Sequence, residues 1–321
     1  VLADIEQLGP LLGEDAGFEG IGVFLDDAVF SDIRSSDVDM RFAPANPRLL
    51  DFALRRLVPR FERSRGNRRL LRVMKTEGFF QSADQENAAV EISRGCVFNC
   101  HYCIIKKARG RLRSRPPRDV LTDVEHLAGS AGEVRLVADD CGSYGQDNGT
   151  SLLELITEIH SRHPRLALSI NYLNPTWLER DLPGYVEIFK RVPITSVNVS
   201  MQTCSQGLLS AMNRHYSASG ALEAVDRIRN ASPDTVVFSH FIVGHPGETW
   251  RDFVLTLRRT GCFDFISIFR YSPRKGTVSA CMSGQVSGRT TAARYHLLLN
   301  AMRLRILLRL LHRQWFRWGR P

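Results

Sequence analysis

The sequence contains no long hydrophobic run and few cysteines, and each shortage excludes a class of protein. No stretch reaches the roughly 18 consecutive apolar residues of a transmembrane helix, so we expect no membrane partner. No secretory signal is visible at the start, which opens on Val1. The seven cysteines include three at metal-ligand spacing, which favours a reducing, cytoplasmic setting over a disulfide framework.

Acidic residues are also outnumbered. The chain has 34 Asp and Glu against 43 Lys and Arg, a formal net charge of +9. This balance permits an acidic partner, such as nucleic acid or a phosphorylated metabolite, without requiring one. With 321 residues and 43% hydrophobic content, the chain can bury a large core as one domain, or as one domain with a small companion.

Three cysteines within one short segment are the strongest feature that is present. Cys96, Cys100 and Cys103 follow the spacing C-x3-C-x2-C. Three thiolates can hold a cubic 4Fe–4S cluster and leave its fourth iron open to another ligand. A structural zinc site requires four ligands, and His101 is awkwardly placed between two of the cysteines to be the fourth. The pattern therefore favours a reactive cluster over zinc or a chance grouping.

This loop, with Tyr102 before its last cysteine, resembles that of the radical S-adenosylmethionine (radical SAM) superfamily. Further similar segments follow in order: residues 109–110, 114–116, 138–145, 200–205, 212–217, 242–249 and 271–277. Together they resemble the methylthiotransferase branch, which inserts sulfur into modified transfer-RNA bases or a ribosomal protein. Residues 139–150, DDCGSYGQDNGT, most resemble the members that act on threonylcarbamoyl-adenosine.

Short β-branched runs alternate with helical patterns from about residue 88 onward. The expected strands are residues 88–92, 133–138, 166–172, 196–201, 236–243 and 265–271. The expected helices are residues 118–127, 151–162, 182–190, 218–229 and 250–259. Six strand–helix repeats predict an α/β fold with a parallel sheet, and the resemblance implies a partial (β/α)6 barrel. Chemistry in such barrels lies at the carboxyl ends of the strands, where the cysteine loop falls.

The pattern divides the chain into three parts. Residues 1–87 form an amino-terminal region without cysteines, residues 88–283 the radical SAM partial barrel, and residues 284–321 a carboxyl-terminal segment. A basic amphipathic helix is expected from about Thr291. We interpret it as a helix that closes the barrel; a membrane-surface helix is the alternative.

The resemblance implies two cofactors, a 4Fe–4S cluster held by Cys96, Cys100 and Cys103, and SAM. An external one-electron reductant such as flavodoxin or ferredoxin would be a partner. Reductive cleavage of SAM gives methionine and a 5′-deoxyadenosyl radical that abstracts hydrogen from the substrate. The cofactor carries this chemistry, and the barrel orients and shields it.

Eight residues are candidates to bind SAM: Tyr102, Asp139, Asp140, Ser200, Gln202, Arg214, Gly244 and Pro246. The two aspartates follow the second strand and can accept hydrogen bonds from the SAM amino group, unless they are simply turn residues. Arg214 can neutralise the SAM carboxylate through a forked contact. Ser200 and Gln202 end the fourth strand and can meet the ribose or carboxylate. Gly244, beside Pro246, lets the backbone approach the adenine.

Two further cysteines, Cys141 and Cys204, follow strand ends and are candidate catalytic residues. A thiol near a substrate radical can donate a hydrogen atom and complete an epimerisation. Alternatively, the two thiols help to hold a second iron–sulfur cluster that supplies sulfur, or they are small buried hydrophobic residues. Cys262 and Cys281 are interpreted as structural.

The chain also departs from the methylthiotransferase pattern. Those enzymes hold a second cluster through three cysteines of a preceding domain and end in an RNA-binding β-barrel, whereas residues 1–95 contain no cysteine and the sequence stops after its terminal helix. We therefore expect a radical SAM enzyme that acts on a small or nucleoside-like metabolite by epimerisation or sulfur insertion. The alternatives are a methylthiotransferase acting on a modified tRNA base and, without catalysis, an iron–sulfur scaffold or nucleic-acid-binding module.

Overall fold

A parallel six-stranded sheet forms the centre of the structure, a computed structural model that describes residues 88–318. Its strands are β1 (Ala89–Glu91), β4 (Glu133–Val137), β5 (Ala167–Leu173), β6 (Ile194–Val199), β7 (Val236–Val243) and β8 (Phe265–Arg270). The order β1-β4-β5-β6-β7-β8 follows the chain, and every neighbouring pair is parallel. This confirms the expected α/β partial barrel.

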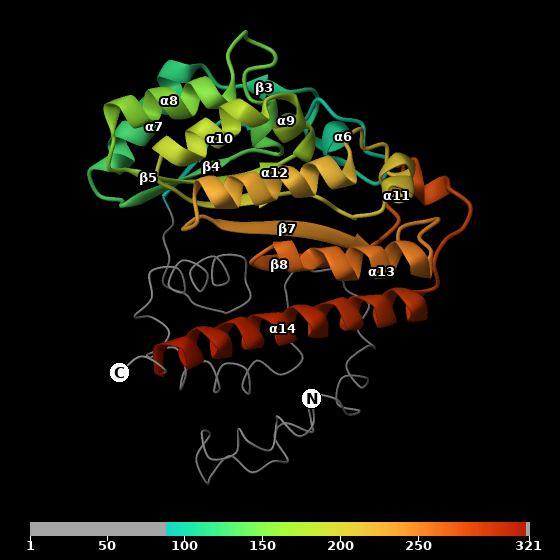
Figure 1. The fold of residues 1–321 in the computed structure, drawn as a ribbon. Helices are drawn as coiled ribbons and strands as arrows, with labels where there is room; N and C mark the ends of the chain where they lie inside the picture. The colour runs from blue at the N-terminus through green and yellow to red at the C-terminus, as the bar shows by residue number, and fades with distance from the viewer. Residues whose placement is uncertain (1–87, 319–321) are drawn as a thin grey trace. The chain divides into compact units, whose positions relative to one another are not determined.

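Five long helices connect the strands: α7 (Pro117–Ala128), α8 (Leu152–Arg162), α10 (Leu182–Arg191), α12 (Ala218–Ala231) and α13 (Trp250–Arg259). Figure 1 shows them following one another across the same side of the sheet. Most of their starts are capped by side chains, as in α13, where Thr249 and Asp252 form a reciprocal capping box. Each helix places an apolar stripe against the sheet, and this layer is the hydrophobic core.

Shorter elements in the loops were not expected from the sequence. They are the helices α6 (Ile105–Arg109), α9 (Pro175–Arg180) and α11 (Gln206–Ala211), and the two-stranded pair β2 (Ser93–Arg94) and β3 (Arg113–Ser114). Three 3-10 turns complete the loops: η2 (Cys141–Ser143), η3 (Thr260–Cys262) and η4 (Ser279–Cys281). Such short elements have no clear periodicity, since tertiary contacts determine them.

The last helix, α14 (Gly288–Trp318), runs beside β8 and α13 (Figure 1). Arg305 donates hydrogen bonds from Nη1 to Thr260 Oγ1 (2.6 Å) and from Nη2 to Leu257 O (2.6 Å). Leu298 and Met302 are buried. These contacts support the interpretation of a closing helix, and within residues 88–318 no helix is long and apolar enough to cross a membrane. The expected amino-terminal region, residues 1–87, lies outside the described residues.

The inner face of the sheet carries polar side chains. Residues paired across neighbouring parallel strands point to the same face. By this register Ser169 and Ser196 share a face, as do His240 and Ser267. On the opposite face, apolar residues such as Phe241 pack toward the helices. The barrel interior is therefore suited to a polar ligand, and the helix-facing side to packing.

Candidate active site

The cysteine loop crosses the carboxyl ends of the strands immediately after β1 and β2. Burial, the neighbouring Asp140 carboxylate and the other two thiols raise the pKa of Cys96 to about 12, and burial also raises the pKa of Cys103. The three thiols are thus close enough to interact. Within residues 88–318 no three side chains converge on a single metal ion. A cubic cluster binds each thiolate to a different iron, so its ligands stand further apart, and the donor set fits it.

Gly95 fixes the start of this loop. Its φ of 77° lies in the left-handed region, and a Cβ atom there would stand 2.3 Å from Arg111 O. The Gly95 N–H donates to Asp139 Oδ2 at 2.8 Å, and Arg109 Nε lies 3.6 Å from Asp139 Oδ1. Asp139, predicted to meet the SAM amino group, therefore binds the cluster loop in this structure.

Arg214 is buried and contacts the cysteine loop. Its Nη1 stands 3.7 Å from Cys100 Sγ and 3.1 Å from Tyr102 Oη, and its Nη2 donates to Ser200 O at 2.5 Å. Its Nε has no partner among the described residues. The guanidinium thus brings three predicted site residues together, and it places a positive charge beside a thiolate ligand. One unused N–H donor remains for an anionic group such as the predicted SAM carboxylate.

Both carboxylate oxygens of Asp140 accept hydrogen bonds from other residues of the chain. Its Oδ1 accepts the Asn174 N–H at 2.9 Å, and its Oδ2 accepts Trp177 Nε1–H at 2.7 Å and the Ser143 hydroxyl. Burial raises its pKa. With both oxygens occupied, this arrangement favours a structural role that holds α9, and contact with SAM stays a prediction.

Tyr102 of the cysteine loop belongs to a row of three aromatic rings. The ring centroids of Tyr102 and His245 are 6.3 Å apart, and those of His245 and Tyr271 are 5.3 Å apart, both edge to face. His245 Nδ1 hydrogen-bonds Pro246 O at 2.9 Å, and its Nε2 has no partner among the described residues. His245 therefore joins the segments that follow β1, β7 and β8, and its Nε2 is available to a ligand.

The segment after β7 is fixed against α14. Gly244 has a φ of 83°, and a Cβ atom there would stand 2.3 Å from Thr291 Oγ1. Its N–H donates to Glu248 Oε2 at 2.6 Å, and the same oxygen lies 2.7 Å from Arg294 Nη1. This ion pair is almost fully buried. Close packing with α14 therefore requires glycine at position 244, and an approach of this backbone to adenine stays a prediction.

Inside the barrel, Asn198 and His240 form a buried polar pair. Asn198 Nδ2 and His240 Nε2 are 2.8 Å apart, and the Ser200 hydroxyl stands 3.4 Å from Asn198 Oδ1. Burial lowers the pKa of His240 to about 4, so its ring is neutral at physiological pH. Gln202 (φ 68°) is buried nearby, with its N–H on His240 O at 2.7 Å.

Three buried oxygen atoms of the sheet have no partner among the described residues: Ser169 Oγ, Asn171 Oδ1 and Ser267 Oγ. Buried polar atoms normally have hydrogen-bond partners, so their presence indicates that a polar ligand or water occupies this interior. SAM, with ammonium, carboxylate, ribose and adenine groups, fits that requirement. The sequence signal for this interior is the set of polar residues at alternate positions of β5 and β6, Ser169 and Asn171 on the first strand and Ser196 and Asn198 on the second.

The contacts found for the two candidate catalytic cysteines are with residues outside the cluster loop. Cys141 is fully buried, and its thiol donates to Asn171 O. Cys204 is buried next to Cys262, and its N–H donates to Thr256 Oγ1 at 3.1 Å, on the α13 side of the sheet. Burial raises the pKa of both thiols. These surroundings favour packing, and the hydrogen-donor role stays a prediction without geometric support.

The remaining cysteines do not form a second site in the described part of the chain. Cys141 and Cys204 have different neighbours, and Cys281 is exposed. A second cluster held by these cysteines therefore has no support in the geometry.

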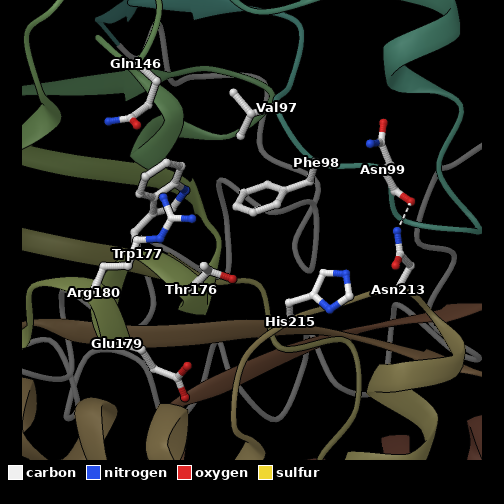
Figure 2. A pocket seen from close by; sticks show the side chains of 10 residues that line it. All are labelled: Val97, Phe98, Asn99, Gln146, Thr176, Trp177, Glu179, Arg180, Asn213 and His215. Carbon is white, nitrogen blue, oxygen red and sulfur yellow. Dashed lines mark hydrogen bonds between the residues drawn. The ribbon is translucent and has the colours of Figure 1, made fainter.

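A pocket of about 560 Å³ opens beside the cluster loop. Figure 2 shows its ten lining residues: Val97, Phe98, Asn99, Gln146, Thr176, Trp177, Glu179, Arg180, Asn213 and His215. The centroids of the Phe98 and Trp177 rings are 5.7 Å apart, and the Arg180 guanidinium lies 4.8 Å from the Trp177 centroid. Sequence reasoning missed this pocket, although Phe98 lies within the cysteine loop and His215 within a segment that it had singled out.

Comparison with known proteins identifies the class. The family model of the Radical SAM superfamily matches residues 90–260, more than half of the chain, and the chain belongs to this superfamily. Among solved structures, the radical SAM methyltransferase TsrM of Kitasatospora setae has a TM-score of 0.51 at 16% identity, over 60% of this chain and 38% of that one. Coproporphyrinogen III oxidase from Escherichia coli has a TM-score of 0.50 at 14% identity, over 68% and 51%. These two similarities concern the fold alone.

Curated relatives point to the methylthiotransferase-like branch. The ribosomal protein uS12 methylthiotransferase of Geobacter sulfurreducens is 34% identical over 227 residues, 68% of this chain and 50% of that protein. The threonylcarbamoyladenosine tRNA methylthiotransferase of Thermotoga maritima is 33% identical over 218 residues, 66% and 48%. A tRNA-2-methylthio-N(6)-dimethylallyladenosine synthase of Akkermansia muciniphila is 34% identical over 221 residues, 65% and 47%. The chain spans about half the length of these relatives.

The chain is thus a radical SAM enzyme of the methylthiotransferase-like type, with a 4Fe–4S cluster and SAM as cofactors. When bound, the cluster supplies the electron that cleaves SAM to a 5′-deoxyadenosyl radical. The chain itself binds and orients the two cofactors. Cys96, Cys100 and Cys103 are the candidate iron ligands, and Arg214 places a positive charge beside Cys100. The polar barrel interior, around Asn198, is the candidate chamber for SAM.

Proposed function

We propose that this chain inserts sulfur into a modified adenosine of transfer RNA, as a methylthiotransferase-type radical SAM enzyme. The observation that carries the proposal is the one-third sequence identity to three methylthiotransferases, over about two thirds of this chain. Two of those three relatives bear names of tRNA-modifying enzymes. Because the chain spans about half of each, the activity of the whole protein is part of the proposal.

Charge near the candidate cluster supports an RNA substrate. Lys107, Arg111 and Arg113 are exposed on the segment that follows Cys103. Basic side chains bind phosphates with release of counterions, and this makes the affinity fall with salt. A small metabolite would not need such a surface. We also propose the cytoplasm as the location and flavodoxin or ferredoxin as the electron source, since a reduced cluster and tRNA are both found there.

The source of the sulfur atom is the step at which the chain departs from the methylthiotransferases. The reaction replaces a carbon-bound hydrogen by sulfur, which is then methylated. The given sequence holds one group of cysteines with cluster spacing, and we propose that added sulfide, or a partner protein that carries sulfur, can supply the sulfur atom. The test must therefore supply sulfide.

Reconstituted protein should be incubated anaerobically with SAM, dithionite, sulfide and unfractionated tRNA, and the nucleosides then analysed by mass spectrometry. We expect 5′-deoxyadenosine and a new adenosine derivative heavier by one methylthio group in place of hydrogen. The Cys96→Ala, Cys100→Ala, Cys103→Ala variant is the control and should give neither. If the product has the mass of the substrate in ordinary water and gains one deuterium in deuterated buffer, the reaction is an epimerisation and this proposal is wrong.

A further inference from the structure

The pocket in Figure 2 is lined in part by residues of the cluster loop. Val97, Phe98 and Asn99 line it, whereas Cys96 and Cys100, which flank them, do not. The side chains between these two cluster ligands therefore contribute to a pocket that the two thiols do not line.

A second wall separates the pocket from the barrel interior. Trp177 lines the pocket with part of its ring, while its Nε1–H donates to the buried Asp140 at 2.7 Å. Trp177 also fills the space beside Gly142, where a Cβ atom would stand 2.1 Å from its Cδ1. A ligand in the pocket would therefore be adjacent to the SAM chamber without occupying it.

The chemistry of the walls selects an aromatic ring that carries negative charge. Phe98 meets Trp177 edge to face, with an interplanar angle of 63°, so both rings contribute apolar surface. Arg180 stacks on Trp177 and is exposed, and His215 is exposed across the pocket. The one lining carboxylate, Glu179, accepts the Ser217 N–H at 2.7 Å and is held at the start of α12. The one carboxylate is thus already hydrogen-bonded, and Arg180 is the cationic group that lines the pocket.

Amide groups add hydrogen-bonding capacity for a base edge. Asn99 Oδ1 accepts Lys106 Nζ at 2.8 Å and retains its NH2 group, and Asn213 Nδ2 donates to Asn99 O at 2.8 Å and retains its Oδ1. Gln146 contributes a third amide at the rim. Unstacked RNA bases are bound in this way, between aromatic or guanidinium planes and amide side chains, with phosphate on a nearby cation.

We infer that this pocket anchors a nucleotide of the RNA substrate other than the one that reacts. The base stacks against Phe98, and its phosphate meets Arg180 and His215. This inference rests on the proposed function, since it assigns a binding site to the same RNA. It also explains why residues between two cluster ligands form part of a pocket that the thiols do not line.

The test is a fluorescence-polarisation titration of the holoenzyme with a short fluorescein-labelled oligoadenylate. Base–aromatic stacking and a charge-assisted phosphate contact are each large enough that Phe98→Leu and Arg180→Gln should each weaken binding about tenfold. Arg180→Gln should also flatten the dependence of affinity on salt. Arg227→Gln, an exposed arginine on α12 that does not line the pocket, is the matched control and should bind as wild type.

Iron content and thermal melting of each variant show that the fold is retained. Equal binding by wild type and both pocket variants, or absence of binding by wild type, would overturn the inference. So would slower flavodoxin-dependent SAM cleavage in Arg180→Gln with unchanged RNA binding, because the pocket would then bind the electron donor. Failure of the proposed function is separate: it would show as pocket-dependent RNA binding without any methylthio product.

Discussion

Gly95 is the residue of the cluster loop whose replacement the structure tolerates least. At φ 77°, an added Cβ atom would stand 2.3 Å from Arg111 O, so alanine must strain the backbone and displace its neighbour. We expect Gly95→Ala to cost at least about 1–2 kcal/mol and to lower the bound iron. Gly129→Ala is the control, because its φ is −70° and no atom lies within 4 Å of the added carbon. Iron analysis and urea unfolding compare the two; similar losses in both would contradict the role of Gly95.

Arg214 combines three contacts that a lysine cannot reproduce. Its fork reaches Cys100 Sγ, Tyr102 Oη and Ser200 O together, and each hydrogen bond to a charged group contributes about 1.5–3 kcal/mol. We expect Arg214→Lys to reduce 5′-deoxyadenosine formation about tenfold or more and to shift the cluster reduction potential. Arg227→Lys, on the exposed face of α12, should change neither. An unchanged potential in Arg214→Lys would show that the arginine acts only in packing.

His240 makes stability depend on pH. Its folded pKa of about 4 is below the ordinary value of 6.5, so the unfolded chain binds the proton more readily between these two values. The stabilisation is complete above pH 6.5 and declines as pH falls, with a total loss of about 3 kcal/mol by pH 4. Urea unfolding of wild type and His240→Gln across this range measures it. The variant should show a shallower decline, and identical slopes would exclude His240 as the source.

Side-chain direction explains why the sequence located the site but assigned several roles incompletely. Sequence reasoning places Asp139 and Asp140 after the second strand, and the structure has them directly after β4, whereas Arg214 lies between α11 and α12. The order of motifs in the sequence does not show which residue each side chain contacts. Asp139 holds Gly95, Asp140 holds Trp177, and both contacts join segments far apart in the chain.

At the scale of elements, α14 is fixed to the β7 loop by one buried ion pair. Glu248 and Arg294 are almost fully buried, and burial raises the pKa of Glu248. Removing one partner leaves an uncompensated charge, so Arg294→Met should destabilise the fold by about 3–5 kcal/mol. The double variant Glu248→Gln, Arg294→Met should recover a large part of that loss. Thermal melting measures both, and a double variant no more stable than the single one would contradict the ion-pair explanation.

Periodicity predicted the long elements well. The six expected strands and five expected helices all occur, and α13 has the expected bounds, because apolar alternation and capping residues such as Thr249 are local signals. The strand β6 begins two residues earlier and ends two residues earlier than expected, since the chain leaves the regular strand before Gln202, whose φ is positive. The short α6, α9 and α11 were missed because loop contacts, rather than local patterns, determine them.

At the scale of the whole molecule, we expect one iron–sulfur cluster in this chain, held by the three loop cysteines. All seven cysteines lie within the described residues, and one group has cluster spacing. We expect about four irons per chain in reconstituted protein. Replacing Cys141, Cys204, Cys262 and Cys281 by alanine should leave that iron and SAM cleavage in place, whereas alanine at Cys96, Cys100 and Cys103 should remove both. Mössbauer spectra decide, because a 4Fe–4S signal that survives loss of the three loop cysteines requires a second cluster and a second set of ligands.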